Sequence, residues 1–283
     1  MVVCGCLHSA NPMTVRALPY SAKKLILNLV KAADHPISAP TLVRIGALFE
    51  LEANNIRVTL NRLVAQGLLV LSEQGSYAFG QEAQMLADQQ KQWHELEQGL
   101  KPWCGGWLAI YVANLGRRDR KLLRKRERIT TLWGFREFEQ GLLIRPDNLK
   151  IDSATLRQNL IELGLEPEAC VFRASEFQCD RQPGELALWP VQQLNENYVE
   201  LTREMRSWLA DYSSKSLQDA ARESFIIGDK VLHNIAYDPR LPGEMINSAS
   251  RGNMVETMIQ FNTVGRAIWL ELIDRVVNDS PLD

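Results

Sequence analysis

The feature that most constrains the fold is a series of three helical patterns followed at once by a hairpin pattern, all within the first 80 residues. Apolar side chains recur at helical spacing in each of the three, and Ser21 can cap the first. The expected helices cover residues 21–33, 40–49 and 52–66, and the expected strands cover 68–71 and 76–79. Three helices and a hairpin in this order predict a winged helix-turn-helix.

The third of these helices carries side chains suited to reading DNA. Opposite its apolar face we expect Asn54, Asn55, Arg57, Val58, Thr59, Asn61 and Arg62. Asparagine contacts adenine edges, arginine makes bidentate contacts to guanine, and a valine or threonine methyl suits the methyl of thymine. No carboxylate occurs from residue 53 to 66, as expected for a surface that approaches phosphates. The alternative is a solvated polar face in some other three-helix unit, but the hairpin directly after it favours DNA binding.

A second region of mixed helix and strand follows a polar stretch, 81–102, which we interpret as a linker helix. Its patterns alternate in the order strand, helix, strand, strand, helix, strand, which is typical of a ferredoxin-like domain. The expected strands are 107–112, 135–138, 141–145 and 170–174, and the expected helices are 117–132 and 152–163.

The first helix of that region is strongly basic, with eight Lys and Arg residues between 117 and 128. A charge run of this kind is often a solvated helix face. The alternatives are a contact with a DNA backbone and a cradle for the phosphates of a nucleotide-like effector. Arg117 and Arg118 stand at the expected helix start, where the macrodipole also favours anions, and this suits the effector. Asp119 is expected inside the helix, paired with its arginine neighbours.

The C-terminal third is mostly helical, with expected helices at 191–211, 217–235 and 253–277 whose apolar stripes are wide enough to bury against one another. We therefore expect an α+β multidomain protein. Its expected parts are a flexible tail at 1–18, a winged helix-turn-helix domain at 19–80, the linker helix at 81–102, a ferredoxin-like domain at 103–182 and a helical effector and dimerisation domain at 183–283.

The formal net charge of −2 is a cancellation between unlike regions. Residues 1–80 carry seven basic and four acidic residues, residues 101–182 carry fifteen and eleven, and residues 190–283 carry nine and fourteen. This asymmetry indicates a phosphate-facing region beside an acidic one.

Cysteine content and hydropathy exclude other classes. The five cysteines are too sparse for a disulfide framework, and Cys4-Gly5-Cys6 with His8 lacks the second pair that a zinc site needs. No apolar run approaches the roughly 18 residues of a membrane span. We expect a cytoplasmic protein with no metal, no cofactor and no membrane contact.

Four stretches of the chain resemble the PaaX-type transcriptional regulators, repressors of phenylacetic acid catabolism. They are 21–27, 55–64, Leu132-Trp133-Gly134-Phe135 followed by 141–146, and Asp238-Pro239-Arg240-Leu241-Pro242. The resemblance spans roughly residues 19–275. The chain departs from the family at residues 248–252, where Asp-Trp-Pro-Gly is usual, and at 232–234, where a tryptophan is usual. Both departures lie where effector specificity is expected to be set.

The resemblance implies a homodimeric repressor that binds a palindromic double-stranded DNA operator and is released by an aromatic acyl-CoA such as phenylacetyl-CoA. It implies base contacts at Asn55, Arg57, Thr59, Asn61 and Arg62, and a wing tip at Gln74, Gly75 and Ser76. We also count Lys23 and Lys24 among the DNA contacts. The expected effector contacts are Arg117, Arg118, Lys121, Trp133, His233, Tyr237 and Arg240.

Two other functions stay open beside a non-enzymatic repressor. A metal-dependent nuclease in the middle region needs acidic ligands near the scissile phosphate, and Val112-Ala113-Asn114-Leu115 lacks the aspartate that similar nucleases place there. The other is an acyl-CoA-binding interaction protein without sequence-specific DNA binding.

Overall fold

The computed structural model describes residues 21–33, 35–72, 74–80, 98–175 and 187–279. It combines helices with two small antiparallel sheets, so the α+β class predicted from the sequence is confirmed. The expected tail, the Cys4–Cys6 cluster and most of the expected linker helix lie outside the described residues. Among the helices that the described ranges contain, none has the length and apolar character needed to cross a membrane.

The N-terminal segment, residues 21–80, contains three helices around one core. Its elements are α1 (Ala22–Ala32), β1 (Ile37–Ser38), α2 (Ala39–Leu48), α3 (Ala53–Ala65), β2 (Leu69–Leu71) and β3 (Ser76–Phe79). The hydroxyls of Ser21 and Ser38 accept hydrogen bonds from Lys24 N and Thr41 N and so cap α1 and α2. The strand order is β1-β3-β2. The sequence prediction missed β1, because two residues are too few to show a strand period.

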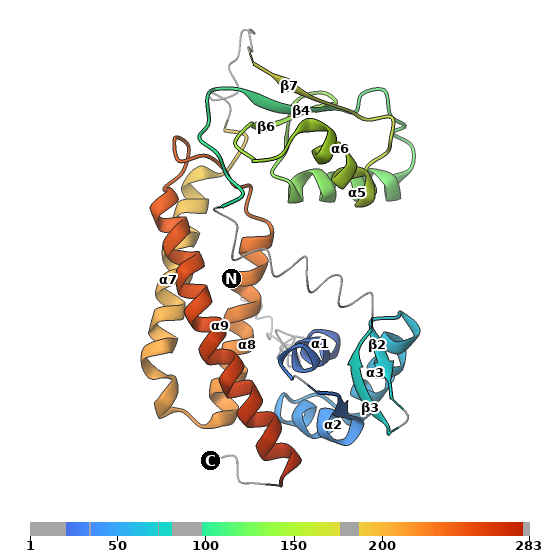
Figure 1. The fold of residues 1–283 in the computed structure, drawn as a ribbon, viewed down its shortest axis with the longest axis vertical. Helices are drawn as coiled ribbons and strands as arrows, with labels where there is room; N and C mark the ends of the chain where they lie inside the picture. The colour runs from blue at the N-terminus through green and yellow to red at the C-terminus, as the bar shows by residue number, and fades with distance from the viewer. Residues whose placement is uncertain (1–20, 34, 73, 81–97, 176–186, 280–283) are drawn as a thin grey trace, which may run out of the picture.

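The middle segment, residues 98–175, follows the element order that the sequence predicts. Its elements are β4 (Trp107–Tyr111), α5 (Arg120–Leu132), β5 (Arg136–Glu139), β6 (Leu142–Pro146), α6 (Ser153–Glu162) and β7 (Cys170–Ala174). The strands form one antiparallel sheet in the order β5-β6-β4-β7. Leu108 and Ile110 of β4 pack with Ile129 of α5 and Leu156 of α6, so both helices cover one face of the sheet (Figure 1).

The start of α5 corrects one expectation. Asp119 does not lie inside the helix but is its N-cap, with its carboxylate accepting hydrogen bonds from Lys121 N at 2.7 Å and Leu122 N at 3.2 Å. Arg117 and Arg118 therefore precede the helix. The physical reason is that an aspartate is among the best N-cap residues, and a carboxylate is stabilised by the partial positive charge at a helix start.

The C-terminal segment, residues 187–279, consists of three long helices that run side by side (Figure 1). They are α7 (Val191–Asp211), α8 (Leu217–Ala236) and α9 (Ser248–Val277), with a short 3-10 turn, η2 (Tyr212–Ser214), after α7. Helix α9 starts five residues before its predicted start, because Asn247 caps it through a hydrogen bond from Ser250 N. Residues 248–252, where the chain departs from the resembled family, thus form the first turn of α9.

The N-terminal segment packs firmly against the C-terminal helices. The Phe49 ring, fully buried, stacks on Trp269 of α9 with centroids 5.3 Å apart and meets the edge of Phe225 of α8 at 6.3 Å. Arg222 of α8 donates to the Leu48 carbonyl at 2.5 Å, and Lys24 of α1 pairs with Asp229 of α8 at 2.7 Å. One continuous apolar core therefore joins the two segments.

The middle segment is attached at the other end of the long helices (Figure 1). Trp189, just before α7, stacks on Trp107 of β4 at 6.3 Å and donates its indole N–H to the Gly134 carbonyl at 2.9 Å. The loop after α8 reaches the same place, because the side chain of Asn148 donates to the Arg240 carbonyl at 2.8 Å. The three segments are thus held as one body.

Candidate nucleic-acid interface

Helix α3 presents a polar surface because its apolar residues are confined to one stripe. Ile56, Leu60 and Leu63 are fully or almost fully buried against α1 and α2. The exposed side consists of Asn54, Asn55, Arg57, Val58, Asn61 and Arg62. We call these six residues the α3 surface. In Figure 1, α1 lies between α3 and the long helices, and the α3 surface is on the side of α3 opposite the buried stripe.

The chemistry of the α3 surface is unusual for a solvated helix face. Val58 is 56 % exposed among polar neighbours. Within the described residues, no ion pair or hydrogen bond occupies the guanidinium groups of Arg57 and Arg62. Both arginines are therefore available to a partner, and the valine methyls lie between them.

Thr59 is not part of this surface, which corrects the sequence prediction. It is only 3 % exposed, and its hydroxyl points toward the side chain of Asn55, with the two oxygen atoms 3.4 Å apart. Thr59 follows Ile56 by three residues and precedes Leu63 by four, so helical geometry puts it in the buried stripe. A side chain in that position does not reach a ligand.

The hairpin after α3 supplies a second exposed edge. Gly75 adopts a φ of 75° in the turn, and its N–H donates to the Ser72 carbonyl at 3.0 Å. Gln74 and Gly75 are exposed and Ser76 is half-buried. On β2, Val70 and Leu71 are 55 % and 49 % exposed, a pair that the sequence analysis did not single out. Alternation along a strand would hide one of two adjacent residues, so no sequence signal predicted that both face solvent.

The two lysines of α1 differ in their surroundings. Lys23 is half-buried, whereas Lys24 is exposed and places its ammonium 2.9 Å and 2.7 Å from the carboxylate oxygens of Asp229. The structure thus uses Lys24 to hold the N-terminal segment on α8. It is already paired, and we do not retain it as a DNA contact.

The residues expected to bind an effector do not come together in one site. Arg117, Arg118 and Lys121 are exposed at the start of α5, while Trp133 caps the opposite end of the helix. A helix of 13 residues is about 20 Å long, so these two groups lie far apart. His233 and Tyr237 contact each other, with ring centroids 4.7 Å apart, at the end of α8.

Arg240 belongs to a buried polar cluster where the C-terminal segment meets the sheet, which the sequence analysis missed. At its centre Arg145 of β6 is 1 % exposed and donates to the Trp133, Pro146 and Arg240 carbonyls and to Asn148 Oδ1. Burial lowers the pKa of Arg145 to about 9, and the charge of Arg240 adds to this effect.

The remaining charge of the cluster is balanced by Asp238. Its carboxylate accepts hydrogen bonds from the Tyr198 hydroxyl and from Arg240 N, each at 2.6 Å, and lies 4.0 Å from Arg251 Nη1. Burial raises the pKa of Asp238. Each guanidinium nitrogen of Arg145 donates a hydrogen bond within the protein, so this cluster is a structural contact between segments.

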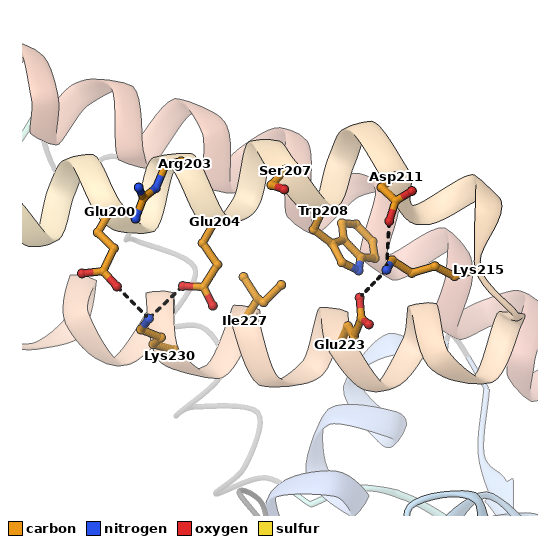
Figure 2. Close-up of a pocket in the computed structure, with 10 residues that line it drawn as sticks. All are labelled: Glu200, Arg203, Glu204, Ser207, Trp208, Asp211, Lys215, Glu223, Ile227 and Lys230. Carbon is orange, nitrogen blue, oxygen red and sulfur yellow. Dashed lines mark hydrogen bonds and ion pairs between the residues drawn. The ribbon is translucent and has the colours of Figure 1, made fainter.

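A groove of about 460 Å³ runs between α7 and α8 on the C-terminal segment (Figure 2). Lys230 lies between Glu200 and Glu204 at one end, and Lys215 lies between Asp211 and Glu223 at the other. Hydrogen bonds from Lys215 to these two carboxylates raise its pKa.

Trp208 lies between the two ends of the groove. It is 4 % exposed, and its indole N–H has no hydrogen-bond acceptor within the described residues. Two carboxylates face Lys215 at one end, and two carboxylates face Lys230 and Arg203 at the other, so neither end offers surplus positive charge to a phosphate.

Comparison with known proteins supports the fold and indicates no activity. The sequence matches no protein-family model. No protein of curated function matches it significantly. Among solved structures, the uncharacterized protein Rv0674 from Mycobacterium tuberculosis is similar, with a TM-score of 0.58 and 20 % identity over 88 % of this chain and 98 % of that chain. The likeness covers nearly the whole of both chains, and at this identity it shows the fold alone.

Proposed function

We propose that the protein is a DNA-binding transcriptional repressor that reads base edges with α3. The observation that carries this proposal is the α3 surface, where two unpaired arginines, three asparagines and an exposed valine occur together without a carboxylate. Arginine pairs with guanine, asparagine with adenine, and an apolar methyl packs on the thymine methyl. We interpret residues 21–80 as a winged helix-turn-helix in which α3 enters the major groove and the β2–β3 turn contacts the backbone.

The rest of the proposal follows the resemblance to the PaaX-type regulators. We interpret the β5-β6-β4-β7 sheet with α5 and α6 as a ferredoxin-like domain, and the three long helices as the domain that binds the effector and a second copy of the chain. A homodimer would place two α3 helices on the half-sites of a palindromic operator. The stretches 21–27, 55–64, 132–135 with 141–146, and 238–242 support membership of that family.

The test of base reading uses Arg57→Ala and Arg62→Ala with a duplex selected from a random pool by the wild-type protein. Each variant loses a base contact, so we expect its affinity for the selected duplex to fall by about 1–3 kcal/mol, with a smaller change for random DNA. Arg206→Ala on α7, also exposed, is the matched control. If fluorescence anisotropy gives the same selected-duplex affinity for both α3 variants and the control, α3 does not read the bases.

We propose that effector binding is transmitted to α3 through α8, because the two sides of α8 contact different parts of the chain. Arg222 and Asp229 hold the N-terminal segment, and the next residues along the chain, Glu223 and Lys230, line the groove toward α7. A ligand that favours a different spacing of α7 and α8 would shift the position of α3.

The effector class that the resemblance implies is an aromatic acyl-CoA. A ligand that binds the native state raises its thermal stability by mass action, so phenylacetyl-CoA at 100 times its dissociation constant should add about 2.7 kcal/mol. A thermal-shift series with free CoA and phenylacetate as controls measures this. An unchanged melting temperature with every CoA thioester would remove this effector class from the proposal.

A further inference from the structure

The exposed side of α5 and the residues just before it form a strongly positive surface. Seven exposed cations lie between residues 117 and 128, against two exposed carboxylates, Asp119 and Glu127. The cations are Arg117, Arg118, Arg120, Lys121, Arg124, Lys125 and Arg128. We call these seven residues the α5 row.

The α5 row is not neutralised by the protein itself. Within the described ranges none of its seven side chains forms an ion pair, whereas Arg126, on the buried side of the same helix, pairs with Glu166. Cations of α8 behave differently, since the half-buried Arg222 and the exposed Lys230 both have carboxylate partners. Asp119 is engaged as the helix cap, which leaves Glu127 as the only carboxylate of the helix surface that opposes the row.

The shape of the row indicates an extended partner. Lys121, Arg124, Lys125 and Arg128 follow one another at helical spacing along one face, and a stretch of this length covers about 10 Å of helix. These four charges therefore form a line and do not converge on one point, as the phosphates of a small effector would require. Duplex DNA carries one negative charge per about 1.7 Å of its axis and offers a line of phosphates to such a row.

The position of α5 relates it to the α3 surface. In Figure 1, α5 lies on the side of the middle segment turned toward the N-terminal segment, and both lie on the same side of the long helices. A duplex held at α3 and extending toward the middle segment would approach the α5 row without crossing α7–α9.

We infer that the α5 row binds the phosphate backbone of the DNA duplex that α3 reads, outside the base-contacted site. This inference rests on the proposed function for the identity of the partner. It reassigns Arg117, Arg118 and Lys121 from the effector to DNA. The middle segment is then a second DNA-binding surface that lengthens the protected duplex and contributes affinity independent of sequence.

The test measures binding of a random-sequence 40-base-pair duplex by fluorescence anisotropy between 50 and 300 mM salt. Each phosphate contact contributes about 0.9 to the slope of log affinity against log salt, so Arg124→Gln/Arg128→Gln should lower the slope by about 1.8 and weaken binding at least about fivefold. Arg203→Gln/Arg206→Gln, two exposed arginines of α7, removes the same charge elsewhere and should leave the slope unchanged. Circular dichroism checks that each variant is folded.

The outcomes separate this inference from the proposed function. If wild-type protein binds DNA and Arg57→Ala weakens its binding, but both double variants keep the wild-type slope, the α5 inference is wrong and the α3 proposal stands. If the α5 double variant has a lower salt slope while Arg57→Ala and Arg62→Ala leave the affinity for DNA unchanged, α5 binds DNA and α3 does not read the bases. An equal decrease of the salt slope in both double variants would mean that the overall charge of the protein, and not the α5 row, determines DNA affinity. Absence of any salt-dependent DNA binding would overturn both proposals.

Discussion

Neighbouring residues of α3 have opposite environments, and this sets the edge of the proposed reading surface. Val58 is 56 % exposed and Thr59 is 3 % exposed. Both have a methyl group that suits thymine, so residue type does not distinguish them. Their positions relative to Ile56 and Leu63 distinguish them, because a step of 100° around the helix takes Thr59 into the buried stripe.

Replacing Thr59 by valine therefore leaves DNA affinity unchanged. The substitution keeps the shape of the side chain and removes a hydroxyl that donates one long hydrogen bond among the described residues, to Asn55 Oδ1 at 3.4 Å. We expect a change in unfolding free energy within about 1 kcal/mol, measured by urea denaturation, since such a weak hydrogen bond contributes little. In the same anisotropy titration Val58→Asp should abolish binding, because it places a carboxylate against phosphates. A loss of affinity in Thr59→Val larger than twofold would contradict the buried assignment.

At the scale of elements, the sequence predicted most helices and strands because their ends have local chemical causes. The expected helix at 52–66 is observed as Ala53–Ala65, and the expected helix at 191–211 is observed as Val191–Asp211. Where the predicted start of a helix was wrong, the residues around the true N-cap concealed it. Asp119 caps α5 although basic residues continue on both sides of it, and Asn247 caps α9 ahead of a stretch without apolar periodicity.

The candidate sites were predictable to different degrees for the same reason. The α3 surface depends on one helix and its period, so its six members follow from the position of the apolar stripe. The cluster around Arg145 depends on β6, α7 and the loop after α8 meeting in space. Long-range contacts of this kind leave no local pattern, and so the expected effector set joined residues that the fold keeps apart.

At the scale of the whole molecule, the position of α3 is set by the C-terminal helices. Phe49 is the centre of this connection, since it is fully buried between Trp269 of α9 and Phe225 of α8 while its backbone belongs to the end of α2. The core of the N-terminal segment is thereby continuous with that of the long helices. In the proposed regulation, we expect a ligand-driven change in α8 to reach α3 through this contact and through the Lys24–Asp229 pair.

Replacing Phe49 by alanine should uncouple these two parts of the molecule. Loss of a buried phenylalanine costs about 3–5 kcal/mol, and here the cavity opens between segments. We expect calorimetry to show the wild-type N-terminal segment unfolding together with the C-terminal helices, and the variant to show an additional transition at lower temperature. The DNA affinity of the variant should also become insensitive to ligands that act through α8.

Phe135→Ala is the matched control, because Phe135 is 1 % exposed in the separate core between the middle sheet and its helices. It should destabilise the middle segment by a similar amount without separating the N-terminal segment from α8 and α9. If Phe49→Ala instead lowers the melting temperature of one undivided transition, the N-terminal segment does not depend on the Phe49 contact for its cooperativity. The orientation of α3 would then depend on the other contacts between the two segments, among them those of Arg222 and Asp229.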